Sequence, residues 1–368
     1  MANLTVGGSE TKTVRLANRL AASGREIHLL VIGPPYSLLE EISEHVSVTC
    51  FDRKTKFSAR IVMRIGHYLK TKNIRTVLCL NPYSLVYGWP ASLIVGRSKV
   101  RLLAAINTSE LRSRRDRMFM ILYGFILRRC DVVIFGSNNQ AATWISQYRI
   151  ENGKTKVIYN GVDADYFLKK QKDINPIKEQ LAIDPAAFVI SCVAQFRPEK
   201  SHIDLLRAAA VLLREHDRNV VVMLVGDGPE EHRIRQFVEQ NNLADHVRFV
   251  GRVRDVRPYL SVCDVSVMPS IAVEVFSNAL LESMAMGVPV ISSDIGGMPE
   301  MIRHEKDGYI YPRSDIERLT DYLRRLITQP GLADEIGSCA KRRVQTDFTI
   351  SRMDQDYSDV IWAREESR

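Results

Sequence analysis

Short apolar runs rich in β-branched residues alternate with helix-like patterns along almost the whole chain. Apolar runs of this length are typical of strands in a parallel sheet that helices cover on both faces. Such strands are predicted at Ile27–Ile32, Val77–Leu80, Val100–Ile106, Val132–Phe135, Val189–Val193, Val220–Val225, Val247–Val250, Val265–Met268 and Val288–Ile291. The pattern therefore predicts an α/β protein made of doubly wound βαβ units.

The 368 residues exceed what one ordinary core holds, so we expect two domains. The boundary is placed after Asn160-Gly161-Val162-Asp163, because a lysine-rich stretch from Lys169 to Lys178 follows it. We therefore expect a first domain at 1–165, a second at 166–350, and a C-terminal helix within 351–368 that crosses back to the first domain. In such proteins ligands bind where the carboxyl ends of the strands face a crevice, so function is expected between the two lobes.

The start of the first domain leaves little room for a first strand. Gly7-Gly8 leads into a helical pattern from Thr13 to Ala22, and a turn of this kind normally follows a buried strand. Since only residues 1–6 precede it, we expect this strand to be truncated or missing.

Composition excludes several classes of protein. A chain that is 45% hydrophobic and 26% charged can bury full cores, which excludes disorder. The longest apolar run, Met118 to Leu127, is too short to cross a bilayer, and the N-terminus has no signal-peptide pattern. We therefore expect a cytoplasmic protein.

The sequence contains no motif typical of a metal site or a dinucleotide-binding site. The six cysteines show no paired spacing, and the histidines form no metal-binding motif, so no metal site and no cofactor are predicted. Gly226-Asp227-Gly228-Pro229 lacks the third glycine of a dinucleotide fingerprint and predicts a tight strand-to-helix turn instead. The net charge of +8 favours an anionic partner without identifying it.

The strongest constellation for chemistry runs from Glu274 to Glu282. Ser277 or Asn278 can cap a helix that ends before Gly287, so Glu274 falls in the preceding loop and Glu282 about five residues past the cap. The open N–H groups at the start of the helix attract a phosphate, and the two acids can accept hydrogen bonds from sugar hydroxyls. A nucleotide sugar meets both needs, whereas the alternative is a surface helix whose acid merely favours the helix dipole.

The chain resembles retaining glycosyltransferases of the GT-B fold, of the large GT4 type. The resemblance covers nearly the whole chain and is strongest over residues 155 to 312. It rests on Glu274 and Glu282 with seven residues between them, Ser293-Asp294-Ile295-Gly296-Gly297-Met298-Pro299-Glu300, Asp307-Gly308, Gly7-Gly8, Asn160-Gly161-Val162-Asp163, Arg197-Pro198-Glu199-Lys200 and Gly226-Asp227-Gly228-Pro229.

The resemblance implies two Rossmann-like domains facing an inter-domain cleft, the first on the acceptor side and the second binding a nucleotide sugar. It assigns catalytic roles to Lys200, Arg197 and Glu274, with Lys200 and Arg197 holding the diphosphate of the leaving group. It assigns donor binding to Gly8, Gly228, Phe276, Ser277, Asn278 and Glu282.

Two positions depart from the family pattern. Gln195 stands where relatives commonly place an arginine, so the assignment of Arg197 is weaker than that of Lys200. Asn107 stands where many relatives place a histidine; it can hydrogen-bond to a sugar hydroxyl on the acceptor or sugar side but cannot act as an acid or base.

A basic and apolar segment at residues 112–129 suggests peripheral contact with the inner face of a membrane, and a buried helix with solvated arginines is the alternative. A nucleic-acid partner is disfavoured, because the arginines are not interleaved with stacking aromatics.

The sequence thus predicts a metal-independent, retaining glycosyltransferase. It would move a sugar from a nucleoside-diphosphate sugar to a glycan, lipid-linked or small-molecule acceptor, in cell-surface polysaccharide or glycolipid assembly. The alternatives are a catalytically silent nucleotide-sugar-binding protein, and an epimerase or phosphorylase on the same scaffold.

Overall fold

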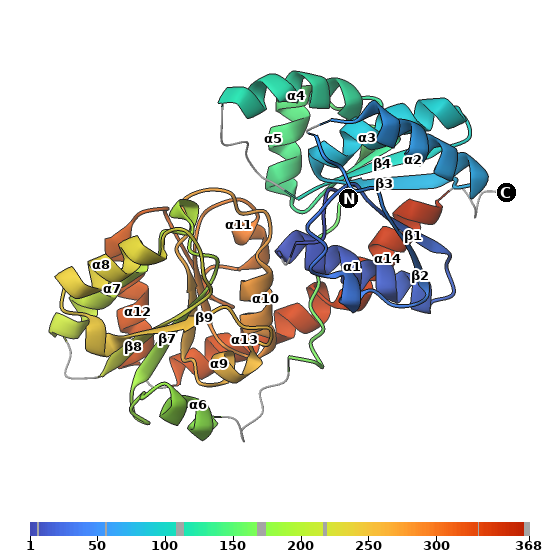
Figure 1. The fold of residues 1–368 in the computed structure, drawn as a ribbon. Coiled ribbons are helices and arrows are strands. Elements are labelled where there is room, and N and C mark those ends of the chain that lie inside the picture. The colour runs from blue at the N-terminus through green and yellow to red at the C-terminus, as the bar shows by residue number, and fades with distance from the viewer. Residues whose placement is uncertain are drawn as a thin grey trace. The chain divides into compact units, whose positions relative to one another are not determined.

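A computed structural model describes residues 1–5, 7–55, 57–107, 114–167, 174–215, 219–329 and 331–363, and of residues 114–120 and 174–175 it describes the backbone alone. The chain divides into two compact units (Figure 1): residues 1–159 with 353–368, and residues 160–352. The division falls after Tyr159 because the next residues bond within the second unit. Val162 exchanges backbone hydrogen bonds with Phe348 and Ile350 there, each 3.0 Å long.

The first unit contains two parallel sheets, ordered β1-β2 and β3-β4-β5-β6. Residues 1–5 form no strand, but Ile32 and Gly33 donate backbone hydrogen bonds to the carbonyls of Met1 and Ala2. The strands are β1 (Ile27–Val31), β2 (Val46–Cys50), β3 (Thr76–Leu80), β4 (Arg101–Ile106), β5 (Val132–Phe135) and β6 (Thr155–Val157).

Helices cover both faces of these strands. In Figure 1, α1 and α14 lie on one side of the strands, and α2, α3 and α4 lie on the other. The helices are α1 (Gly8–Ala22), α2 (Ala59–Thr71), α3 (Asn81–Val95), α4 (Arg114–Leu127), α5 (Asn138–Tyr148) and α14 (Ile350–Trp362). Helix α14 starts in the second unit, and an ion pair between Arg19 and Asp354 holds its later part on α1.

The second unit has one parallel sheet in the order β12-β11-β10-β7-β8-β9. The strands are β7 (Phe188–Val193), β8 (Val220–Val225), β9 (Val247–Gly251), β10 (Val265–Met268), β11 (Val290–Ser293) and β12 (Tyr309–Tyr311). The helices are α6 (Ile174–Gln180), α7 (His202–Glu215), α8 (Glu231–Gln240), α9 (Arg257–Ser261), α10 (Asn278–Ala285), α11 (Met298–Met301), α12 (Ile316–Thr328) and α13 (Leu332–Asp347).

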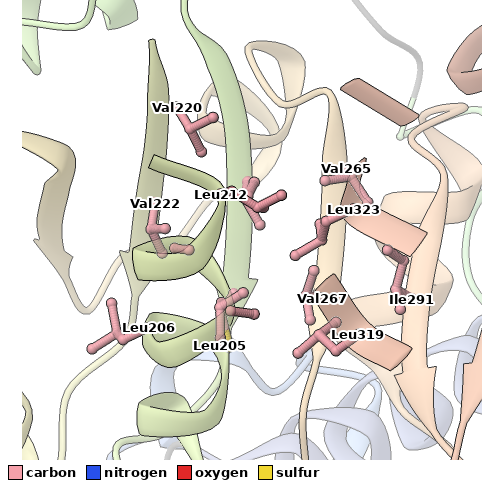
Figure 2. Close-up of a cluster of buried hydrophobic side chains, with 14 of the residues drawn as sticks. Leu205, Leu206, Leu212, Val220, Val222, Val265, Val267, Ile291, Leu319 and Leu323 are labelled. Carbon is pink, nitrogen blue, oxygen red and sulfur yellow. The ribbon is translucent and has the colours of Figure 1, made fainter. Parts of the chain in front are cut away.

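The core of the second unit forms where α7 and α12 pack on the sheet. Figure 2 shows leucines of these two helices gathered against valines of β8 and β10. Leu205, Leu323 and Val267 are completely buried there. The α/β, doubly wound fold class predicted from the sequence is confirmed.

All nine predicted strands are present, each within two residues of its expected ends. Three strands were not predicted: β2, which reads Val-Ser-Val-Thr-Cys and alternates apolar with polar residues, and the three-residue strands β6 and β12. No helix among the described residues is long and apolar enough to span a membrane.

Candidate functional site

The order in which strands are added to the second unit's sheet reverses between β7 and β10. From β7 the chain adds β8 and then β9 on one side, and it later adds β10, β11 and β12 on the other. The loops that leave the carboxyl ends of β7 and β10 therefore start on neighbouring strands and lead to opposite sides of the sheet. In open α/β sheets this switch point is where ligands bind. The β7 loop carries Lys200, and the β10 loop carries Glu274.

Lys200 and Glu274 form an ion pair at this switch point. The Lys200 ammonium contacts Oε1 of Glu274, and the side chains are 19% and 8% exposed. Ser270 donates a second hydrogen bond to the same oxygen, 2.9 Å long. No donor among the residues that the structure describes reaches the other oxygen, Oε2. The carboxylate is thus fixed through one oxygen and has the second available as an acceptor.

The two loops are also joined through their backbones. The Ile271 amide donates to the Glu199 carbonyl over 2.8 Å, one residue before the lysine. Ser201, directly after Lys200, has φ +44°, and Val273, directly before Glu274, has φ +59°. A left-handed backbone is costly for a residue with a Cβ and especially for a β-branched one. Strain at both neighbours of the ion pair indicates that the surrounding structure enforces these loop conformations.

Gly296 and Gly297 support the Glu274 loop from β11. The Gly297 amide donates to the Val275 carbonyl over 2.9 Å. Gly296 has φ +57°, and a Cβ placed on it would lie 1.9 Å from the carbonyl oxygen of Glu274. Only glycine therefore allows this close approach.

Gly228 supports the Lys200 loop in the same way from β8. It has φ +154°, and an added Cβ would lie 2.5 Å from the carbonyl oxygen of Phe196. The Phe196 amide in turn donates to Asp227 over 2.8 Å. The turn that the sequence predicted at residues 226–229 thus packs against the backbone just before Arg197.

Helix α10 begins at Asn278, four residues after Glu274. The Ser277 hydroxyl caps it by accepting from the Leu280 amide at 3.3 Å. The first N–H groups of a helix have no partner within it, so those of Asn278 and Ala279 are available to an anion. Phe276 is buried, and its carbonyl accepts a hydrogen bond, 2.7 Å long, from the side-chain Nδ2 of Asn160. Glu282 lies one turn further along and is half-buried.

Arg197 differs from Lys200 in its surroundings. It is exposed at the start of the short 3₁₀ helix Pro198–Lys200, and its guanidinium makes no hydrogen bond or ion pair with the described part of the chain. Gln195, two residues earlier, is also exposed. The structure therefore brings Lys200 to Glu274 and leaves Arg197 at the rim of the loop.

His202 follows Lys200 by two residues and was not singled out from the sequence. It is 2% exposed, its ring meets that of Phe196 edge-on at 4.8 Å, and neither ring nitrogen has a partner among the described residues. Burial, aided by the nearby Lys200 ammonium, lowers the pKa of His202 to about 4. The imidazole is therefore neutral at pH 7 and adds no charge beside Lys200.

The first unit has its own polar cluster at the carboxyl ends of β3 and β4. Asn107 follows β4, and its side-chain oxygen accepts a hydrogen bond, 3.3 Å long, from the Lys12 ammonium on α1. The Asn107 backbone N–H donates to the side chain of Asn81 over 3.1 Å, and its own buried Nδ2 has no partner in the described structure. Gly8 is exposed at the first position of α1. Lys12 and Asn81 were not predicted, because isolated polar residues next to a strand or within a helix carry no sequence signal.

The cluster in the second unit can hold an anion and a polyhydroxyl group together. The Lys200 ammonium and the start of α10 supply positive charge, and the free oxygen of Glu274 supplies an acceptor. Among the described residues, no three His, Cys, Asp or Glu side chains are grouped to hold a metal ion.

Known proteins resemble this chain across both units. The model of Glycosyltransferase Family 4 matches residues 6–166, and that of Glycosyl transferases group 1 matches residues 173–343. N-acetyl-alpha-D-glucosaminyl L-malate synthase of Bacillus anthracis is 24% identical over 97% of this chain and 94% of its own. A GDP-mannose-dependent alpha-(1-6)-phosphatidylinositol monomannoside mannosyltransferase of Mycobacterium tuberculosis is 25% identical over 64% of each chain.

A solved structure has the same fold. The crystal structure of HepE from Anabaena in complex with UDP matches with a TM-score of 0.86 at 21% identity, over 99% of this chain and 100% of the other. At this identity the likeness shows the fold, which is the two-lobed arrangement known as GT-B.

Substituting Gly296 tests the support of the Glu274 loop. Gly296→Ala forces a Cβ into the Glu274 carbonyl, whereas Gly251→Ala, at φ +78° with open space around it, adds backbone strain alone. Gly251→Ala should lower the free energy of unfolding by about 1 kcal/mol, and Gly296→Ala by at least about 2 kcal/mol more. Urea titrations of both variants measure this difference, and equal losses would contradict the packing argument.

Protonation of His202 should make the second unit sensitive to acid. The unfolded histidine titrates near its ordinary pKa, so the unfolded chain gains a proton between about pH 6.5 and 4 that the native chain does not. Stability is therefore lost as the pH falls through this range. Between pH 7.5 and 5 the free energy of unfolding of the wild type should fall by about 2 kcal/mol more than that of His202→Phe.

Urea titrations followed by circular dichroism measure this loss. Tryptophan fluorescence would report on the first unit instead, because all three tryptophans, Trp89, Trp144 and Trp362, lie there. The exposed His232→Gln serves as control and should behave as the wild type. Equal pH dependence of His202→Phe and wild type would show that the buried ring is not the cause.

Proposed function

This chain belongs to the family 4 (group 1) glycosyltransferases and takes its sugar from a nucleotide sugar, and from this premise we propose that Lys200 and Glu274 form the centre of its donor site. One observation carries the proposal: the two side chains meet at the switch point of the second sheet, beside the start of α10. We further propose that residues 166–350 bind the donor and that residues 1–165 hold the acceptor, with the helix at 351–368 returning to the first domain.

Glu274 receives hydroxyls of the donor sugar. Its Oε1 is already engaged by Lys200 and Ser270, so Oε2 is the oxygen that accepts from the sugar. The backbone N–H groups near Phe276, Ser277 and Asn278 hold phosphate or sugar oxygens at the positive end of the helix dipole. Glu282 accepts from the ribose hydroxyls, and Gly228 keeps the loop of residues 195–200 close to the nucleotide.

Lys200 stabilises the leaving group. As the bond between the anomeric carbon and the phosphate oxygen breaks, negative charge grows on the diphosphate, and the ammonium offsets it. The exposed Arg197 supplies a second cation when a donor is present. The acceptor oxygen forms the new bond to the anomeric carbon on the same face, and its proton passes to the departing phosphate oxygen. This retaining course needs no protein base and no metal ion.

The acceptor side is proposed to use the polar cluster of the first unit. The buried Nδ2 of Asn107 is a donor with no partner in the described structure, which suits a hydroxyl or anionic oxygen. Lys12 places a cation beside it, and Gly8 leaves the backbone of α1 open to close approach. Two relatives are named for L-malate and for phosphatidylinositol monomannoside, and both of these molecules carry negative charge. We propose a glycan, lipid-linked or small anionic acceptor, in glycolipid or polysaccharide assembly.

Two other activities fit the same donor site and are tested directly. Incubating the donor with inorganic phosphate and no sugar acceptor separates these enzymes from a transferase, because an epimerase converts the donor sugar and a phosphorylase moves it to phosphate, whereas a transferase leaves it intact. A silent binding protein would bind the donor but would not transfer the sugar to any acceptor. The match of both family models supports the transferase.

Substituting the ion pair should abolish donor binding and transfer. One sugar nucleotide among UDP-, GDP- and ADP-sugars should raise the melting temperature of the wild type, since at about 100 times Kd ligand binding adds about 2.7 kcal/mol of stability. Lys200→Met and Glu274→Gln should lose this shift, measured from each variant's own unliganded value. They should also lower kcat at least about 100-fold.

Lys306→Ala is the matched control, because this lysine is exposed in a turn of the same unit. It should keep both the shift and the rate. Full transfer by folded Lys200→Met and Glu274→Gln would contradict the proposed site.

A further inference from the structure

Positive charge is concentrated in one stretch of the first unit. Residues 59–129 contain fourteen Lys and Arg and two Asp and Glu, a net charge of +12, so the rest of the chain carries −4. Residues 59–107, which include α2 and α3, contain no acidic residue at all. The basic character of the protein is therefore a property of one region.

The same region exposes large apolar side chains on three helices. Ile121 is 78% exposed and Met63 61%, although both are side chains that proteins normally bury. The six residues, which we call the α2–α4 face, are Met63 on α2, Leu93 and Ile94 on α3, and Ile121, Leu122 and Phe125 on α4.

Contacts between the helices make this face continuous. The ring of Phe125 meets that of Trp89 edge-on at 5.7 Å, and Leu93 lies one turn after Trp89 on α3. Ile94 packs against Gly66 of α2, where an added Cβ would lie 2.8 Å from it. Met63 lies one turn before this glycine. Figure 1 shows α2, α3 and α4 on one side of the strands of this unit.

Exposed cations border the apolar residues. The Arg129 guanidinium lies 3.4 Å from the centre of the Phe125 ring, and Arg128 beside it is exposed. Arg60 and Arg64 are exposed on α2, next to Met63. Arginines placed this way can keep their charge in water while the apolar side chains enter a less polar medium.

We propose that the α2–α4 face docks on the surface of a bilayer that contains anionic lipids. Aliphatic side chains ringed by arginines, with no acid on α2 or α3, match an acyl interface below a layer of negative headgroups. A nucleic acid would instead need exposed aromatic rings for stacking, and among the six residues of this face Phe125 is the one aromatic ring, already covered by Arg129. The face extends the basic segment expected at 112–129 onto α2 and α3; residues 112–113 and the side chains of 114–120 lie outside the described structure.

Docking does not depend on the proposed donor site, so the two are tested separately. The probe is vesicle flotation of the full chain with phosphatidylcholine alone and with phosphatidylcholine containing about one-third phosphatidylglycerol. The protein should float with the anionic vesicles and not with the neutral ones. Raising NaCl from about 0.05 M to about 0.5 M should reduce the bound fraction, because salt screens the arginines.

Variants test whether the α2–α4 face, rather than the overall charge of the protein, binds the vesicles. Ile121→Gln combined with Leu122→Gln, and Arg60→Glu, should each lower the bound fraction at least about fivefold. Leu39→Gln is the matched control, since Leu39 is 42% exposed in the same unit and lies outside the face. All variants should keep the circular dichroism spectrum and the donor-induced thermal shift of the wild type.

The inference is overturned if the wild type does not float with anionic vesicles at low salt. It is also overturned if the face variants float as well as Leu39→Gln. Salt-sensitive binding of a single-stranded oligonucleotide without vesicle binding would assign the face to nucleic acid instead.

Discussion

The ion pair between Lys200 and Glu274 is the interaction on which the proposed site depends. Both side chains are mostly buried, and removing one partner of a buried pair typically costs about 3–5 kcal/mol, because the other charge is left without compensation. Each side chain therefore holds the loop of the other in place. The Lys200 ammonium has three N–H donors, so it can bind an oxygen of a donor diphosphate without releasing Glu274.

The rest of the second unit holds these two loops in register. The order of strands places β7 beside β10, so residues 74 positions apart in the sequence leave the sheet together. Gly228 and Gly296 bring neighbouring loops against the backbones of Phe196 and Glu274 at distances that a Cβ would not allow. The strained backbone of Val273 persists because these contacts over-determine it.

Sequence patterns predicted the features that local chemistry specifies. Continuous apolar runs marked nine strands, and Ser277 and Gly287 marked the ends of α10, because burial, capping and positive φ each select residue types. Strand β2 was missed because it alternates polar and apolar residues. The contacts of Lys200 with Glu274 and of Lys12 with Asn107 join distant segments, so no local pattern reveals them.

The proposed site requires that the Lys200 ammonium bind the donor diphosphate while Oε2 of Glu274 accepts from a sugar hydroxyl. A crystal structure with the nucleoside-diphosphate sugar that stabilises the protein tests it most directly. The account predicts the Lys200 ammonium within about 3.2 Å of a phosphate oxygen and the Glu274 carboxylate at the same range from a sugar hydroxyl. A bound donor whose diphosphate lies away from Lys200 would contradict the proposed site.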